Sequence, residues 1–423
     1  MYVVSITIPD SVTSIGRSAF YECENLTSIT IPNCVTSIGE YAFYGSQDVK
    51  TIAIGKGILS IGAFAFSNLT SLEAVTIDAA LKTISECLFA NDEVLKDVNI
   101  KGIEVIEGGA FMNCALLETI DLSSVVSIGM EAFSSCLGLT SVDLSKVVVL
   151  EAGAFIMCNN LVDVKLGVIE TINEQALSCI GVTEIKLPST IKYIAPTAFY
   201  YNINMTKFTN LAGEDTVLIN DYVKLDQGVL YTTTNNNKLL LSCYPTNKED
   251  VNYEVLFNTV RIDEYAGYFN KNLETIVFPD TLEFIGNYAF YGCTKLKSVE
   301  FKSVKAPTFE GTVTDLGIEY EPDSEIYQIL NKYFQFNGYY PMYYAQFIDL
   351  VGKTKKMNII IPGNEDVSGY DNILYQLYFD LDNKTVSDYI AMDSYSIDYL
   401  NKVEMIPDEI KLIPKNVLEP ILK

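Results

Sequence analysis

Short segments in which apolar and small polar residues alternate recur at a regular spacing along the chain. Residues 26–31 read LTSITI, and this alternation predicts a strand with one buried face. A second extended segment, for example 35–39 (VTSIG), leads to an Ala-Phe pair. The second residue of that pair returns every 22 or 23 residues, at Phe20, Phe43, Phe66, Phe89, Phe111, Phe133, Phe155, Leu177 and Phe199, and later at Gly267 and Phe290.

The central apolar residue of the strand segment keeps the same period, from Ile6, Ile29 and Ile52 to Ile276 and Val299. One repeat of this length cannot bury its own apolar side, so successive repeats must stack on one another. The strands should then form a long parallel sheet with neighbours about 4.8 Å apart. The fold class we expect is a solenoid of mainly β or α/β type.

The repeated string SITIPxSVTSIGxxAFxxC resembles the BspA-type leucine-rich repeat of surface proteins from bacteria and some protists. The resemblance covers roughly residues 1–309 and is specific, because spacing and residue type agree over about ten repeats. It implies a right-handed leucine-rich repeat superhelix. It also implies a secreted or cell-surface protein whose role is adhesion or protein binding.

The repeat pattern divides the chain into four expected parts. Repeats fill 1–209 and resume over 253–309, and they are interrupted at 210–252 by an insert with a hairpin turn at Asn235-Asn236-Asn237. Residues 310–423 are rich in tyrosine and predict a mixed α/β cap or terminal domain. The helices expected there span 323–335, 342–351, 371–379 and 386–401, with a strand at 357–361.

Composition narrows the possible functions. The 423 residues include 29 basic and 54 acidic side chains, a formal charge of −25, which argues against nucleic acid as a partner. Histidine is absent, so the usual general base, the Ser/His and Cys/His nucleophile pairs and the commonest metal ligand are missing. A Ser–Lys or carboxylate pair could substitute, but no spacing singles one out. We therefore expect no enzyme activity and no cofactor.

Five of the nine cysteines lie three residues after the repeat aromatic: Cys23, Cys114, Cys136, Cys158 and Cys293. Other repeats place Ser46, Asp92 or Asn202 there, which predicts a row of small side chains bonded to neighbouring backbone. No CxxC motif occurs, so we expect free thiols and no zinc site. The run Asp380-Leu381-Asp382-Asn383 is a poor calcium loop, because it lacks the central Gly and the distal Glu.

The solvent-facing columns of the predicted sheet provide the main candidate site. Like charges on adjacent rungs, as at Asp121 and Asp143 or at Lys165 and Lys186, are unfavourable. We therefore predict a partner-binding face, with an ordinary solvated face as the alternative. Its residues are Asp97, Asp121, Asp143, Asp163, Lys165, Glu184 and Lys186.

Tyrosines that follow the repeat aromatic form a second set of candidates, because tyrosine offers contact area at low entropic cost. They are Tyr21, Tyr44, Tyr200, Tyr268 and Tyr291. The expected partner is a host or matrix protein, or another surface protein. Two alternatives stay open: a glycan-binding surface, and a histidine-free hydrolase or lyase within 310–423.

The chain shows no apolar run long enough for a transmembrane helix, and no basic amphipathic stretch. We therefore expect no membrane insertion. Residues 1–4 lead directly into a repeat strand without a signal peptide, so either the chain is a fragment of a surface protein or it is intracellular.

Overall fold

A computed structural model of the chain describes residues 4–77, 81–296, 298–302 and 307–309, and the backbone of Lys356–Ile361, Tyr375–Asp380, Ile390–Met392 and Leu412–Pro414. The chain divides into two compact units after Gln227, a point that lies inside the 210–252 insert. Every regular element among the described residues is a β-strand. The expected solenoid is confirmed, and in the part that the structure describes it is of the mainly β type.

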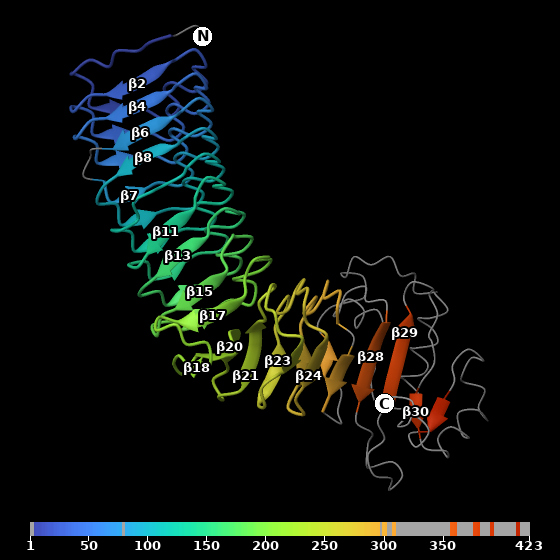
Figure 1. The fold of residues 1–423 in the computed structure, drawn as a ribbon. Coiled ribbons are helices and arrows are strands. Elements are labelled where there is room, and N and C mark those ends of the chain that lie inside the picture. The colour runs from blue at the N-terminus through green and yellow to red at the C-terminus, as the bar shows by residue number, and fades with distance from the viewer. Residues whose placement is uncertain are drawn as a thin grey trace. The chain divides into compact units, whose positions relative to one another are not determined.

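The first segment of most repeats in unit 1 forms a strand that pairs parallel with that of a neighbouring repeat (Figure 1). The register pairs equivalent residues of successive repeats, such as Ile29 with Ile52, and the apolar residues alternate with exposed polar ones. These first-sheet strands are β2 (Ser28–Ile31), β4 (Thr51–Ile54), β6 (Ala74–Ile77), β8 (Asp97–Ile100), β11 (Ser141–Leu144), β13 (Asp163–Leu166), β15 (Glu184–Leu187) and β17 (Lys207–Asn210).

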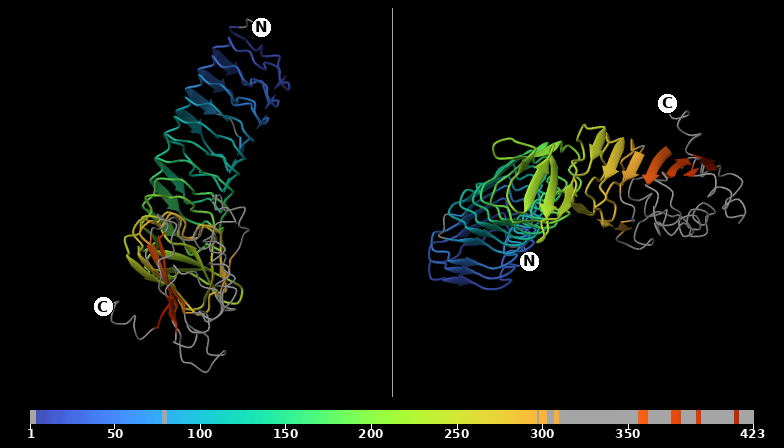
Figure 2. Two further views of the ribbon diagram at one scale, coloured as in Figure 1. Left: turned by 90° about the vertical axis from the view of Figure 1, so that its right-hand side faces the viewer. Right: turned by 90° about the horizontal axis from the view of Figure 1, so that it is seen from below.

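The second segment of each repeat forms a two-residue strand of another parallel sheet, and Figure 2 shows the coils of unit 1 stacked on one another from two further sides. Its strands run in the orders β1-β3-β5 and β7-β9-β10-β12-β14-β16. They are β1 (Ser14–Ile15), β3 (Ser37–Ile38), β5 (Ser60–Ile61), β7 (Thr83–Ile84), β9 (Val105–Ile106), β10 (Ser127–Ile128), β12 (Val149–Leu150), β14 (Thr171–Ile172) and β16 (Tyr193–Ile194).

A column of phenylalanine rings, carried by the turn segments, forms part of the core of unit 1. The rings of Phe111 and Phe133 are stacked with centroids 5.3 Å apart, and those of Phe133 and Phe155 with centroids 5.0 Å apart. All three side chains are fully buried. The segment that carries each ring is built of turns, which need left-handed residues such as Glu131 and Ser135 on either side of Phe133.

Unit 1 ends with the antiparallel strands β18 (Val217–Leu218) and β19 (Val223–Asp226). Unit 2 begins with β20 (Val229–Thr233) and β21 (Leu239–Cys243), which pair antiparallel across the turn at Asn235-Asn236-Asn237. The expected hairpin is therefore present. Its second strand also pairs parallel with β23 (Thr259–Ile262), so the hairpin joins the solenoid sheet of unit 2.

Unit 2 continues the two-sheet arrangement. One sheet has the order β20-β21-β23-β25-β27 and the other the order β22-β24-β26-β28-β29, while β30 and β31 pair parallel. The strands not yet given are β22 (Asn252–Glu254), β24 (Thr275–Phe278), β25 (Phe284–Ile285), β26 (Ser298–Phe301), β27 (Thr308–Phe309), β28 (Lys356–Ile361), β29 (Tyr375–Asp380), β30 (Ile390–Met392) and β31 (Leu412–Pro414).

The terminal segment corrects two of the expected helices. The strand expected at 357–361 is confirmed as β28, but residues 375–379 lie in β29 and residues 390–392 in β30. Tyr375, Leu377 and Phe379 alternate with polar or amphipathic residues, and antiparallel pairing with β28 satisfies their backbone. The helices expected at 323–335 and 342–351 lie outside the described residues.

Candidate functional site

The seven charged candidates lie on the solvent-facing side of the first-sheet segment of unit 1. Six of them are exposed: Asp97, Asp121, Asp143, Asp163, Lys165 and Lys186. Glu184 is half-buried, and its carboxylate accepts a hydrogen bond of 2.6 Å from the Thr209 hydroxyl. We call this set the charged face. Its residues alternate with buried apolar ones along each strand, as the alternation in the sequence predicts.

Within the charged face, opposite charges on adjacent rungs are paired. Asp143 lies opposite Lys165 in the β11–β13 register, and their carboxylate and ammonium are 2.7 Å apart. The Lys165 ammonium, assisted by Ser145, lowers the pKa of Asp143 to about 2. Because both side chains are largely exposed, the pair contributes less than about 1 kcal/mol to stability.

The like charges of Asp121 and Asp143 are each offset locally. Asp121 accepts a hydrogen bond of 3.0 Å from the Ser123 amide, and Asp143 accepts one of 2.9 Å from the Ser145 amide. Ser123 and, more weakly, the Lys101 charge lower the pKa of Asp121. Both carboxylates therefore also close a turn after the strand segment, a role that their repeat spacing did not indicate.

The first-sheet ladder of unit 1 is interrupted at the two places where like charges would face each other. Residues 119–122 form no strand, only an isolated bridge between Thr119 and Asp97, so Asp121 and Asp143 are not paired. No pairing joins β13 to β15 among the described strands either, and Lys165 is thus not in register with Lys186. The repeat at this second interruption is also one residue shorter than the repeat before it. Only Gly181 stands before Val182, whereas Asn159 and Asn160 stand before the equivalent Leu161.

The tyrosine candidates fall into separate groups. Tyr21 and Tyr44 are stacked in unit 1 with ring centroids 5.2 Å apart, and Tyr268 and Tyr291 are stacked in unit 2 at 5.6 Å. Tyr200 contacts the Tyr201 ring instead. Since each stacked ring covers the face of its neighbour, fewer ring faces are left for a sugar to stack upon.

A parallel aromatic column two residues before the core ring was not predicted. Tyr41 stacks on Phe64 with centroids 4.9 Å apart, and Tyr265 stacks on Tyr288 at 5.3 Å. Arg17 extends the unit 1 column, because its guanidinium lies 5.5 Å from the Tyr41 ring centroid. The repeat spacing between Tyr41 and Phe64 was the signal that could have identified it.

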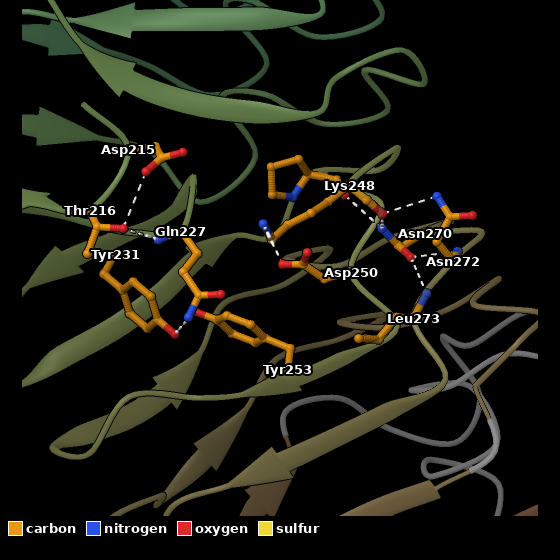
Figure 3. A network of polar contacts seen from close by, with 11 residues as sticks. Asp215, Thr216, Gln227, Tyr231, Lys248, Asp250, Tyr253, Asn270, Asn272 and Leu273 are labelled. Atoms are coloured by element: carbon orange, nitrogen blue, oxygen red, sulfur yellow. Dashed lines mark hydrogen bonds and ion pairs between the residues drawn. The ribbon is translucent and has the colours of Figure 1, made fainter. Parts of the chain in front are cut away.

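Two buried polar contacts of unit 2 are among the residues drawn in Figure 3. The hydroxyl groups of Tyr231 and Tyr253 are 2.7 Å apart, and both rings are buried. The Lys248 ammonium is also buried and lies 2.7 Å from the Asp250 carboxylate. The two hydroxyls thus join neighbouring turns, whereas the ion pair neutralises a buried charge within one turn.

Metal and membrane features were tested on the described part of the chain. There, no three His, Cys, Asp or Glu side chains gather in a way that could hold a metal ion, and the nine cysteines are free thiols. Of the poor calcium loop, Asp382 and Asn383 lie outside the described residues. Among the same residues we find no helix with the length and apolar character needed to cross a bilayer.

Two solved structures of leucine-rich repeat proteins are similar to this chain over about three quarters of its length. A leucine-rich cell surface protein from Faecalibacterium prausnitzii is 24% identical, with a TM-score of 0.44, over 73% of this chain and 72% of that one. A leucine-rich repeat protein from Bacteroides ovatus is 22% identical, with a TM-score of 0.49, over 72% and 77% of the two chains. No curated protein matches the chain.

The family comparison covers more than half of the chain. The model of the BspA type leucine-rich repeat region matches in six copies, over residues 2–118, 82–206 and 258–335. The matched stretches include the turns that carry the charged face and the buried phenylalanine column. The chain therefore belongs to the BspA-type leucine-rich repeat family.

Proposed function

We propose that the chain is a non-enzymatic protein-interaction or adhesion module that binds a partner protein through the charged face. The observation that carries this proposal is the fixed arrangement of exposed charges on consecutive turns. Parallel register holds Asp163 beside Ser141 and Lys165 beside Asp143, so a partner meets a pattern whose geometry does not need to be ordered on binding.

Membership of a repeat family whose known examples include surface proteins supports a secreted or cell-surface location. A stacked fold of this kind offers an extended surface rather than an enclosed site, which favours binding over catalysis. A host, matrix or other surface protein is accordingly the partner class that we propose. The stacked tyrosine rings give the glycan alternative less support.

Charge reversal on the full chain tests the proposal. Asp97 and Asp163 are both exposed, and no hydrogen bond or ion pair of their carboxylates is described. The double variant Asp97→Lys/Asp163→Lys should therefore fold normally but lose binding to immobilised matrix proteins and intact host cells, measured by biolayer interferometry and cell adhesion.

The matched control is Glu86→Lys/Glu174→Lys, which makes the same charge change at exposed residues of the turn segments that carry the core rings. Its binding should equal that of the unchanged chain. Equal binding by both double variants, or an equal loss in both, would contradict a role for the charged face.

A further inference from the structure

A row of small polar side chains runs inside unit 1, three residues after the core ring in most turns. Four of them, Ser46, Cys114, Cys136 and Cys158, donate a hydrogen bond to the backbone carbonyl of the ring residue in the preceding turn. Cys114 Sγ donates to the Phe89 carbonyl at 3.1 Å, and Ser46 Oγ donates to the Phe20 carbonyl at 3.2 Å. The row therefore consists of hydrogen-bond donors.

Two turns have an apolar residue at this position, Leu69 and Ile180, which cannot form such a hydrogen bond. The polar side chain of the following turn bonds the backbone there instead. The Ile180 amide donates to Asn202 Oδ1 at 2.9 Å, while Asn202 Nδ2 donates to the Leu177 carbonyl at 2.8 Å. One side chain thus accepts from one backbone group and donates to another.

Asp92 occupies the equivalent place after Leu69. The Leu69 amide donates to Asp92 Oδ1 at 2.7 Å, as the Ile180 amide does to Asn202. The second oxygen, Asp92 Oδ2, takes the place of the Asn202 amide nitrogen, and the carbonyl equivalent to that of Leu177 is that of Phe66. Asp92 is fully buried, and its Oδ2 has no hydrogen-bond partner.

An ionised Asp92 would present a second acceptor where the row requires a donor, at a fully buried position. We propose that Asp92 is a neutral carboxylic acid in the folded protein and that its Oδ2–H donates to the Phe66 carbonyl. Ionisation of this single group then removes the donor and weakens the turns around it as the pH rises.

The surroundings of Asp92 agree with a neutral acid. Burial raises its pKa well above the ordinary value, and the Leu69 amide opposes this only in part. The titratable group that faces it from the following turn is the Cys114 thiol, whose own pKa is raised by burial. No lysine or arginine is bonded to Asp92 among the residues that the structure describes, and the adjacent Glu93 is exposed.

The sign of the pH dependence follows. The unfolded chain releases this proton near pH ~3.9, whereas the folded chain keeps it to a higher pH. Between these two pKa values the folding equilibrium constant falls about tenfold per pH unit through this group alone. The contribution of Asp92 is therefore fully present in acid and is lost as the pH rises through the folded pKa.

The test compares unfolding of the unchanged chain, Asp92→Asn and Asp97→Asn between about pH 4 and pH 8, a range that starts at the pKa of an unperturbed carboxyl. Asp97→Asn makes the same charge change at an exposed residue of β8. The advantage of Asp92→Asn over the unchanged chain should be small near the acid end and grow with pH. Asp97→Asn should follow the unchanged chain.

Infrared spectroscopy of the unchanged chain provides a second test that needs no variant to fold. A protonated carboxyl band should be present in the folded unchanged chain at neutral pH and lost when that chain unfolds, and a folded Asp92→Asn variant should lack it. A pH-independent difference between Asp92→Asn and the unchanged chain, or the absence of that band, would overturn the proposal.

Discussion

Asp143 and Lys165 lie opposite each other on β11 and β13, and their charged groups are 2.7 Å apart. The pair cancels two charges in the middle of the charged face. What a partner meets around the pair is therefore the negative charge of Asp97, Asp121 and Asp163, together with the positive charge of Lys186. Electrostatic recognition should accordingly depend more on these four residues than on the central pair.

Removing Lys165 should affect the titration of Asp143 more than it affects stability. In Lys165→Met the pKa of Asp143 should rise from about 2 toward the ordinary ~3.9, because the ammonium that favours the carboxylate is gone. The contribution of the pair to stability is fully present above the pKa of Asp143 in the unfolded chain. It is lost as the pH falls through about 2, the pKa of Asp143 in the folded chain. The loss at neutral pH should be below about 1 kcal/mol.

Carboxyl NMR titration of Asp143 measures this effect, and Lys186→Met is the control. Lys186 lies opposite the uncharged Thr209 in β17, so its removal should leave the Asp143 titration unchanged. An unaltered Asp143 pKa in Lys165→Met would show that the pair does not form in solution.

Truncating a core ring should strongly destabilise unit 1. Phe133 is fully buried and stacked between Phe111 and Phe155, so Phe133→Ala leaves a cavity and should cost about 3–5 kcal/mol. Phe133→Leu should cost less, because Leu177 fills the same repeat position and is fully buried. Denaturant unfolding followed by circular dichroism measures both, and equal losses would contradict the stacking account.

The repeat could be predicted from the sequence because each apolar position is determined by a neighbour one turn away. Ile29 must face inward if Ile52 does, and the same periodic constraint places Phe43 on Phe66. The exposure of Asp97, Asp163 and Lys165 followed from the same alternation. These features depend on period alone, which the sequence displays directly.

Features that depend on pairing between particular side chains could not be predicted in this way. The closure of a turn by Asp121 depends on the backbone amide of Ser123, and the donor role of Asn202 depends on an apolar residue one turn earlier. The prediction of a helix at 371–379 was wrong because a short amphipathic pattern fits both a helix and a strand. Pairing of Leu377 with Ile359 across the sheet decides between them.

The cysteine row should resist modification until the solenoid unfolds. Cys136 and Cys158 are buried, and burial raises the pKa of Cys158 to about 12, so very little thiolate forms at neutral pH. Alkylation of these two thiols should be much slower than that of the half-buried Cys34, as measured by mass spectrometry over time. Equal rates in the folded protein would show that the row is open to solvent.

Substitution of Cys136 tests its role as a donor. Its thiol lies 3.1 Å from the Phe111 carbonyl, and Ser46 makes the equivalent contact from a serine hydroxyl. Cys136→Ser should therefore retain the hydrogen bond, whereas Cys136→Ala should lose it, at a cost of about 1 kcal/mol. If the alanine variant were as stable as the serine variant, the thiol would contribute through packing alone.

Two buried tyrosines of unit 2 should respond in opposite ways to loss of the hydroxyl. The Tyr231 hydroxyl bonds that of Tyr253, whose ring lies beside it in Figure 3. It also accepts a hydrogen bond of 3.3 Å from the Leu256 amide. Tyr231→Phe leaves buried polar groups with fewer partners and should cost about 1–3 kcal/mol. The Tyr244 hydroxyl is buried without a hydrogen-bond partner, so Tyr244→Phe removes a desolvated group at no cost in bonding.

Tyr244→Phe should consequently be neutral or stabilising, although both variants delete one oxygen from a ring that is almost fully buried. Denaturant midpoints of the two full-length variants, measured side by side, give the comparison. Because volume and burial are matched, only the difference in hydrogen bonding separates them. A larger loss in Tyr244→Phe than in Tyr231→Phe would mean that Tyr244 bonds a buried water in solution and would reverse the assignment of the two hydroxyls.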